Sequence, residues 1–303
     1  MDLIKLYDKL SNYISLDRIK KNELMKNHTS FKIGGPVDIL VLPRDAQEIK
    51  EVINICKQEL VPFVVIGNGT NLLVTDKGIR GVAIKLSQNF NDILVNGYTL
   101  KCKAGVSLSA ASNVALDNSL SGLEFANGIP GSIGGATVMN AGAYDGQMSD
   151  IVKKVKVLNY SGDIYDLYHD DLEYSYRYSV LQNREEILLE VEMELKPGNY
   201  SVIKKKMDKY LSLRKEKLPL NLPSAGSTFK RPPGNYAGYL IEKAGLKGYR
   251  IGDAMVSNLH AGFIVNMGNA TSKDVIELIT HIQKTVKERF GINLEPEIKI
   301  QGE

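Results

Sequence analysis

Apolar residues recur at intervals of three to four positions in several segments of the chain, which is the spacing of amphipathic helices. Asp45, with Glu48 three residues later, predicts a capping box at the start of one helix. Ser272 is expected to cap the last helix, and Gly291 to end it. Helices are predicted for residues 2–14, 45–59, 107–120, 200–217, 236–244 and 272–290.

Short runs of β-branched and other apolar residues, bounded by turn residues, predict strands between these helices. Asn96-Gly97 and Ser161-Gly162 each close a predicted hairpin. The proline-rich residues 218–234 are expected to be irregular, and a polar connection is expected before Thr29. Strands are predicted for residues 37–42, 63–66, 81–86, 93–105, 152–159, 163–168, 187–195, 254–257, 261–267 and 294–300.

One stretch departs from both patterns, because seven of the 25 residues from Gly122 to Gly146 are glycine and none is Lys or Arg. A flexible linker would be polar, whereas this stretch contains Phe125, Ile133 and Met139. It is therefore predicted to be a loop packed into a core. Glycine-rich loops expose backbone N–H groups in concave nests that bind anions, phosphate above all.

A second glycine loop, Gly67–Val74, follows a predicted strand and leads into another. It lacks the Gly-Lys-Ser/Thr ending of a Walker A loop, and it does not open a helix as the Rossmann fingerprint does. Taken alone it could be an ordinary tight turn. Beside the longer stretch it is interpreted as a second phosphate-binding loop.

Composition narrows the class of protein. The 303 residues are 43% hydrophobic and 24% charged, with a net charge of +3, which is too weak to indicate a nucleic-acid partner. Cys56 and Cys102 show no metal-binding spacing and the four histidines are scattered, so no metal site is predicted. We expect a cytoplasmic protein of two or three domains, without a signal peptide or membrane span.

Five motifs stand in one order along the chain: the two glycine loops, YSYRYS at 174–179, AGSTFKRP at 225–232 and LEPEI at 294–298. Together they resemble the family of UDP-N-acetylenolpyruvoylglucosamine reductases, the flavoenzymes that complete the muramic acid precursor of bacterial peptidoglycan. The resemblance extends from about Thr29 to Gly302. Each motif is weak alone, whereas the ordered set is specific.

The resemblance implies an α+β fold. An FAD-binding module of the PCMH or vanillyl-alcohol-oxidase type would hold the flavin between two lobes, residues 1–90 and 91–198, and residues 199–303 would form an α+β substrate-binding domain. Lys196-Pro197-Gly198 is a plausible boundary on composition alone. Some members carry an inserted loop with a substrate-closing tyrosine after the arginine motif. This chain lacks that loop and resembles the shorter, second type.

The resemblance also implies the cofactors FAD and NADPH. Both glycine loops would bind the FAD pyrophosphate through backbone N–H groups. The cofactor-binding residues it implies are Ser30, Ile33, Gly34, Gly67, Asn68, Gly69, Thr70, Asn71, Leu72, Gly128, Ile129, Gly131, Ser132, Gly134, Gly135, Ala136, Asn140, Ala141 and Gly142.

Three residues match the catalytic positions of the family: Arg177, Ser227 and Glu297. Hydride addition to C3 of the enolpyruvyl ether develops negative charge at C2 and on the carboxylate, which an arginine can stabilise. Ser227 is expected to protonate C2, and Glu297 to position or polarise the reacting group. Taken singly, they could instead be a surface ion pair, a turn residue and an exposed edge charge.

For the substrate, the resemblance and local charge favour a diphosphate site at Lys217, Lys230 and Arg231, although a solvated charged loop would have the same composition. Tyr176 is expected to pack near the sugar or the base. No metal is expected, and we expect a monomer. Two alternatives stay open: another FAD-dependent oxidase or dehydrogenase of the same fold, and a nucleotide-sugar binding protein without redox activity.

Overall fold

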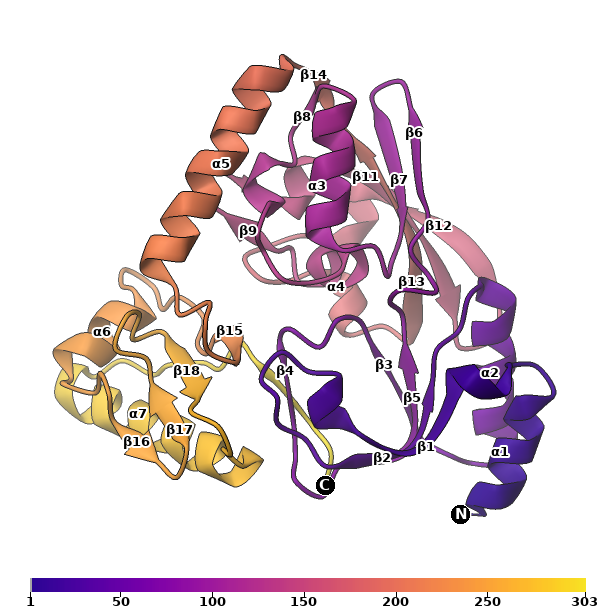
Figure 1. Cartoon of the computed structure of the whole chain (residues 1–303), viewed down its shortest axis with the longest axis horizontal. Coiled ribbons are helices and arrows are strands. Elements are labelled where there is room, and N and C mark those ends of the chain that lie inside the picture. The colour runs from indigo at the N-terminus through magenta and orange to yellow at the C-terminus, as the bar shows by residue number, and fades with distance from the viewer. Residues whose placement is uncertain (1) are drawn as a thin grey trace. The chain divides into compact units, whose positions relative to one another are not determined.

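The computed structural model describes residues 2–303, which form two compact units, each assembled from three stretches of chain (Figure 1). Unit 1 contains the chain up to Lys21, Ile39–Asn68 and Gly81–Leu213. Unit 2 contains Asn22–Asp38, Gly69–Arg80 and Arg214–Glu303. The chain therefore passes between the units several times, and one crossing is the Asn68–Gly69 peptide bond of the first glycine loop.

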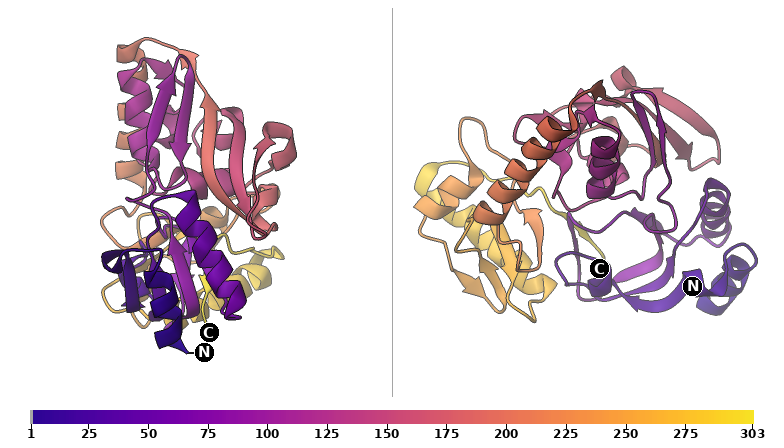
Figure 2. Two further views of the ribbon diagram at one scale, coloured as in Figure 1. Left: turned by 90° about the vertical axis from the view of Figure 1, so that its right-hand side faces the viewer. Right: turned by 45° about the horizontal axis from the view of Figure 1, so that its top comes forward.

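Unit 1 contains a five-stranded sheet and the larger part of a four-stranded sheet. A four-stranded sheet has the order β1-β2-β5-β3 and contains β1 (Ile19–Leu24), β2 (Pro36–Val41), β3 (Phe63–Ile66) and β5 (Ile79–Lys85). An antiparallel five-stranded sheet has the order β12-β11-β13-β7-β6 and contains β6 (Ile93–Asn96), β7 (Thr99–Lys103), β11 (Val152–Asn159), β12 (Ile164–Tyr168) and β13 (Glu186–Glu194). In Figure 2 the five strands lie next to one another, from the magenta β6–β7 hairpin to the pink strands.

Amphipathic helices cover these sheets. The helices of unit 1 are α1 (Leu3–Ser11), α2 (Ala46–Gln58), α3 (Leu108–Asp117) and α4 (Ile133–Val138). α2 buries Ile49, Val52 and Ile53, as its spacing predicts, and α1 packs beside it. α4 packs against β13 and β7, so the short helix inside the glycine-rich stretch is anchored in the core of unit 1.

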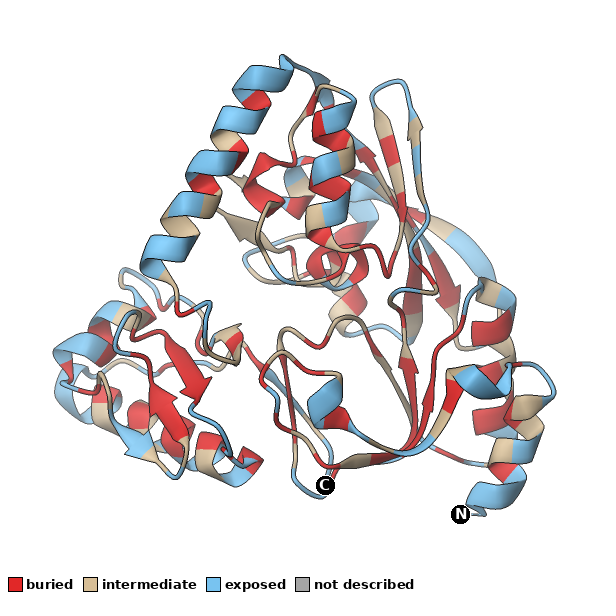
Figure 3. Ribbon diagram, viewed as in Figure 1, coloured by how far each residue is buried: buried red, intermediate tan, exposed pale blue. Residues whose placement is uncertain are grey.

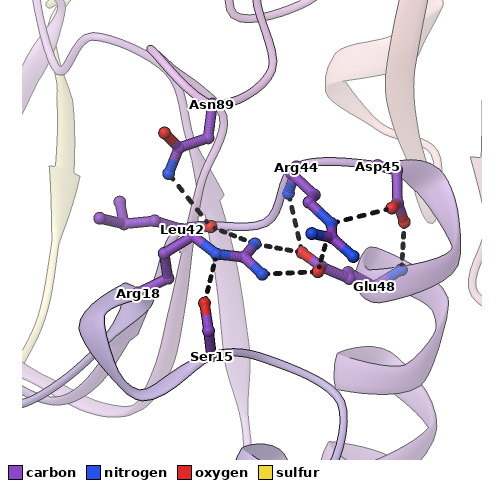
Figure 4. A network of polar contacts seen from close by, with 7 residues as sticks. All are labelled: Ser15, Arg18, Leu42, Arg44, Asp45, Glu48 and Asn89. Atoms are coloured by element: carbon purple, nitrogen blue, oxygen red, sulfur yellow. Dashed lines mark hydrogen bonds and ion pairs between the residues drawn. The ribbon is translucent and has the colours of Figure 1, made fainter.

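A largely buried ion pair joins the N-terminal segment to α2 (Figure 4). Arg18 binds the Glu48 carboxylate with two nitrogens, one of them Nη2 at 2.7 Å from Oε1, and their side chains are only 12% and 7% exposed. Arg18 also donates to the Ser15 hydroxyl at 2.8 Å and to the Leu42 carbonyl at 3.2 Å. The backbone N–H of Arg44 donates to Glu48 at 2.8 Å. Both charges are therefore paired and hydrogen-bonded, as buried charges must be.

Unit 2 is built on a four-stranded antiparallel sheet of order β15-β18-β17-β16. Its strands are β15 (Ser224–Ser227), β16 (Arg250–Ile251), β17 (Ala254–Val256) and β18 (Phe263–Asn266). α6 (Ala237–Lys243) and α7 (Ser272–Phe290) contribute to its core, and β17 and β18 are buried (Figure 3). β4 (Leu72–Val74) pairs in parallel with the C-terminal strand β19 (Lys299–Gln301).

α5 (Tyr200–Lys217) contains the crossing from unit 1 to unit 2 at Leu213–Arg214. Most of its surface is exposed, and its buried residues are Ile203, Met207 and Tyr210 (Figure 3). The polar composition of this helix, with its run of lysines, agrees with that exposure.

Several sequence predictions need correction. Thr271, not Ser272, caps α7, because Thr271 and Asp274 form a reciprocal capping box. Ser272 is the first residue of the helix, and its hydroxyl donates to the carboxylate of Asp76 at 2.8 Å. The predicted strand 294–300 is reduced to β19 and a single bridge between Phe229 and Pro296, since a proline has no N–H for a ladder.

Three of the elements that were missed lie in the segments that matter most for the site. The glycine-rich stretch contains α4, which Ser132 caps by accepting from the N–H of Gly135 at 3.2 Å. The irregular region 218–234 contains β15, and the polar connection contains β1. In each case tertiary pairing or capping supplies what weak local propensity does not.

We expect Glu48→Ala to lower the free energy of unfolding by about 3 kcal/mol or more, because it leaves Arg18 charged and unpaired in a largely buried position. Urea denaturation measures the change. Glu51→Ala is the matched control, since Glu51 lies on the same helix and only accepts from Gln47 at an exposed position. The control should change stability by about 0.5 kcal/mol or less. Equal effects of the two substitutions would contradict the role assigned to the ion pair.

Candidate functional site

The first glycine loop runs from β3 to β4 and depends on close backbone approach. A Cβ at Gly67 would lie 2.5 Å from Ser132 Oγ, so this glycine brings the two glycine loops together within unit 1. Gly69 has φ +64°, and a Cβ there would lie 2.3 Å from the carbonyl oxygen of His28. Real Cβ atoms do not approach so closely, so neither position accepts a side chain without rearrangement.

The predicted cofactor residues of the preceding segment belong to unit 2, as does Gly69. These residues are Ser30, Ile33 and Gly34. The N–H of Ser30 donates to the Gly69 carbonyl at 3.1 Å, and its hydroxyl donates to the Ser224 carbonyl at 2.6 Å. Ile33 is buried in the core of unit 2. The predicted residues of the first lobe are therefore connected to β15, the strand that contains Ser227.

In the second loop, several backbone N–H groups already donate hydrogen bonds to the protein. The N–H groups of Ile133 and Gly134 donate to the carbonyls of Val106 and Ala104, and that of Gly135 donates to the Ser132 hydroxyl. These donors hold α4 on the rest of unit 1. The N–H groups of Gly134 and Gly135 are therefore already used within the protein, so this stretch offers fewer donors to a phosphate than its glycine content suggests.

Other N–H groups of the loops are not used in this way. Among residues 2–303, the backbone N–H groups of Asn68, Gly131 and Ser132, all in unit 1, donate no hydrogen bond to the protein. Backbone N–H groups that have no protein acceptor, in loops where glycine leaves the backbone uncovered, are the groups that bind pyrophosphate. The two loops thus fit the pyrophosphate of a dinucleotide cofactor.

Arg177 lies in unit 1 at the tip of a two-residue turn. Ser175 and Tyr178 exchange backbone hydrogen bonds of 3.2 Å in both directions, and Arg177 adopts the left-handed φ of +56°. Its guanidinium donates to the Gly142 carbonyl at 3.0 Å and lies 5.1 Å from the centre of the Tyr176 ring. Both contacts hold a permanently charged group beside the second glycine loop.

Three side chains attach this turn to the end of α4. Asn140 donates to the Ser175 carbonyl at 3.0 Å and accepts from the N–H of Ser149 at 3.0 Å. Ser179 donates to the Val138 carbonyl at 2.7 Å. Gln182 donates to the carbonyls of Val138 at 3.2 Å and Arg177 at 3.0 Å.

Ser227 and Glu297 come together in unit 2 through their backbones. Ser227 is exposed at the end of β15 and pairs with Phe263. The next residue, Thr228, accepts from the N–H of Glu297 at 2.8 Å, and the Glu297 carbonyl accepts from the Asn71 amide at 3.1 Å. The serine motif, the LEPEI motif and the first glycine loop therefore meet within this unit.

The predicted substrate residues are placed as follows. Lys230 forms an ion pair with Glu295 at 2.6 Å, and Arg231 stacks over the Tyr236 ring at 4.5 Å. Lys217 is exposed at the end of α5, and Tyr176 is half exposed beside Arg177. Lys230 is thus already partly neutralised by a carboxylate, a feature that the basic composition of the motif does not reveal.

A tyrosine contact that sequence reasoning missed fixes α5 on the glycine-rich stretch. The Tyr144 ring stacks on Tyr210 with centres 4.2 Å apart, and the Tyr144 hydroxyl donates to the Tyr210 carbonyl at 2.9 Å. The Tyr210 hydroxyl donates to Asp145 at 2.5 Å and, together with Lys206, holds the pKa of that carboxyl below its usual range. Burial and the same bond raise the pKa of Tyr210.

His260 packs into unit 2. Its Nδ1 accepts from the N–H of Gly262 at 3.1 Å, its ring lies edge-on to Phe263, and burial lowers its pKa. These contacts describe a packed ring that is kept neutral.

Within residues 2–303 no three or more His, Cys, Asp or Glu side chains are grouped so as to hold a metal ion. None of the helices in the same range combines the length and the apolarity needed to span a bilayer.

Comparison with known proteins gives two family matches. Residues 37–168 match the model of an FAD binding domain, and residues 218–301 match the model of the UDP-N-acetylenolpyruvoylglucosamine reductase C-terminal domain. The first match contains both glycine loops, and the second contains the serine and LEPEI motifs. The predicted α+β fold with an FAD-binding module is confirmed.

Individual relatives agree over the full length of the chain. The UDP-N-acetylenolpyruvoylglucosamine reductase of Caldanaerobacter subterraneus is 55% identical over 98% of each chain, and that of Alkaliphilus metalliredigens is 50% identical over the whole of both. The crystal structure of UDP-N-acetylenolpyruvylglucosamine reductase from Thermus caldophilus superimposes with a TM-score of 0.82 at 36% identity, over 94% of this chain and 99% of that one. The chain therefore belongs to the family of UDP-N-acetylenolpyruvoylglucosamine reductases.

Proposed function

We propose that the protein reduces the enolpyruvyl ether of UDP-N-acetylglucosamine to UDP-N-acetylmuramate, with NADPH as the electron source and FAD as the bound cofactor. Family membership makes it an FAD-containing oxidoreductase of peptidoglycan precursor synthesis. The observation that carries the proposal is the match over the whole chain, from the FAD-binding domain to the substrate domain that is particular to this family.

The two glycine loops bind the FAD pyrophosphate in this proposal. The backbone N–H groups of Asn68, Gly131 and Ser132 in unit 1 support it, because a diphosphate needs donors that the protein has not already used. When bound, FAD would supply the redox chemistry that passes a hydride from NADPH to C3 of the enolpyruvyl group. The protein's own task is to bind, orient and protonate.

Arg177 binds the substrate carboxylate. A guanidinium presents paired donors that match a carboxylate, and its charge stabilises the negative charge that develops at C2 and on that carboxylate. The left-handed turn and the contacts with Gly142 and Tyr176 support this role, since strained residues cluster where geometry serves function.

Ser227 protonates C2, and Glu297 positions or polarises the reacting group. The exposure of Ser227 and the backbone bond that brings Thr228 to Glu297 support the pairing of these two residues. A serine is a weak acid without an adjacent base, so its proton must be replaced through Glu297 or through water.

The diphosphate of the substrate binds at Lys217, Lys230 and Arg231, and Tyr176 packs near the sugar or the base. Phosphate is recognised by clustered cationic side chains, and Lys230 must exchange or share its Glu295 partner to take part.

The remaining proposals concern organisation. We assign residues 1–90 and 91–198 to the two lobes of the FAD module and 199–303 to the substrate domain. The match of the C-terminal family model to 218–301 supports the last assignment. In this proposal the protein acts in the cytoplasm, because its small-molecule substrates are soluble nucleotides. It also acts as a monomer in this proposal.

Purified protein should be yellow with a flavin absorption spectrum, and it should oxidise NADPH over many turnovers only when the enolpyruvyl UDP-sugar is present. Oxygen consumption with another substrate and no use of NADPH would identify an oxidase of the same fold. Binding of UDP-sugar by a protein that takes up no FAD would identify a non-redox binding protein. Either result overturns the proposal.

Ser227→Ala should leave reduction of the flavin by NADPH nearly unchanged and slow the transfer to the enolpyruvyl sugar by about 10²-fold or more, the scale of a lost general acid. Stopped-flow absorbance separates the two half-reactions. Ser212→Ala, on the exposed side of α5, is the control and should alter neither. If Ser227→Ala damages both half-reactions equally, the serine has a structural role.

A further inference from the structure

We propose that Asn140 and Gln182 are positioning residues for Arg177, fixing its turn on the end of α4, and that the Asn140 side chain does not bind the flavin. This inference rests on the proposed function only in the role it gives to Arg177. The geometry that carries it lies entirely within unit 1.

The turn at Ser175–Tyr178 keeps its shape only at a cost in conformational free energy. It has two backbone hydrogen bonds, while Arg177 occupies a left-handed conformation that costs a residue with a Cβ about 1 kcal/mol or more. Glycine or asparagine would relieve that cost, but neither carries a guanidinium. An arginine that must sit here therefore needs external bonds to keep the turn closed.

Asn140 supplies one such bond, and the protein covers its amide almost completely. Its side chain is within a residue that is 2% exposed, and it is used at both ends, donating to the Ser175 carbonyl and accepting from the N–H of Ser149. Asn140 itself has φ +42°, which asparagine tolerates better than most residues. Its type and its conformation are thus explained by the support of the turn.

Gln182 supplies the second bond, to the turn residue itself. Its amide donates both to the Val138 carbonyl, at the end of α4, and to the carbonyl of Arg177 itself. Ser179 adds a bond to the same Val138 carbonyl. The backbone of Arg177 is therefore fixed relative to α4, the helix that follows the proposed pyrophosphate loop, and the bond to Gly142 orients its side chain.

The consequence is that the carboxylate-binding guanidinium and the flavin loop form one rigid piece of unit 1. An error of about 1 Å in the placement of a reacting group can lower the rate by about 10²-fold. Support of the turn should therefore affect the half-reaction that uses Arg177 and spare the one that does not.

Asn140→Asp and Gln182→Glu test this, because each keeps the shape of the side chain and replaces its donor by a carboxylate oxygen facing a carbonyl. Both variants should retain FAD and normal reduction by NADPH, and should slow transfer to the enolpyruvyl sugar by about 10–10²-fold. In an Arg177→Ala background the same substitutions should change that rate by no more than about twofold, since the residue through which they act is gone.

A readout independent of activity accompanies the kinetics. Hydrogen exchange of the peptide that covers residues 174–179 should be faster in both variants than in the parent protein. Asn118→Asp is the matched control, because Asn118 also donates its amide to a backbone carbonyl, Val114 at 2.8 Å, but lies at the end of α3. It should change neither the exchange nor the kinetics.

Three results would overturn the proposal: loss of FAD in Asn140→Asp, which would make Asn140 a flavin ligand; unchanged exchange at 174–179; or fully additive effects in the Arg177→Ala background. If Asn140→Asp does not fold, Gln182→Glu decides alone. Failure of the proposed function has a different signature, because the parent protein would then not transfer electrons to the enolpyruvyl sugar, while the exchange experiment would still report on the support of the turn.

Discussion

The candidate site depends on two glycines at which neighbouring atoms leave no room for a side chain. Gly67 meets Ser132 within unit 1, and Gly69 meets the His28 carbonyl within unit 2. These glycines are two residues apart, so one short loop supplies a close contact to each unit. The N–H groups around them are thereby held in place, which is what a preorganised anion site requires.

Elsewhere the protein combines paired buried charges with local backbone strain. The buried Arg18–Glu48 pair fixes the N-terminal segment on α2, and the Asp76 carboxylate accepts from Ser272 at the start of α7. Against that background Arg177 is held in a conformation that its residue type disfavours. Strain of this kind persists only where the surroundings over-determine the backbone, and here the surroundings are the bonds to α4.

Periodicity predicted the long elements well, because α2, α7 and the β11–β12 hairpin each bury a regular set of apolar residues or close on a glycine turn. It missed β1 and β15, whose pairing comes from distant segments, and it placed a loop where Ser132 caps α4. The motifs pointed to Arg177, Ser227 and Glu297, but Gln182 carries no local signal, since its role exists only once Val138 and Arg177 are near it.

The interleaving of the two units has a consequence for synthesis. Every segment of unit 1 has been translated by Leu213, whereas unit 2 needs residues from three stretches that end at the C-terminus. β4 finds its parallel partner only in Lys299–Gln301. Because domains fold from the N-terminus as the chain leaves the ribosome, β4 must wait unpaired until residues 299–301 have been made, and shorter ribosome-bound chains should contain a folded unit 1 with an incomplete unit 2.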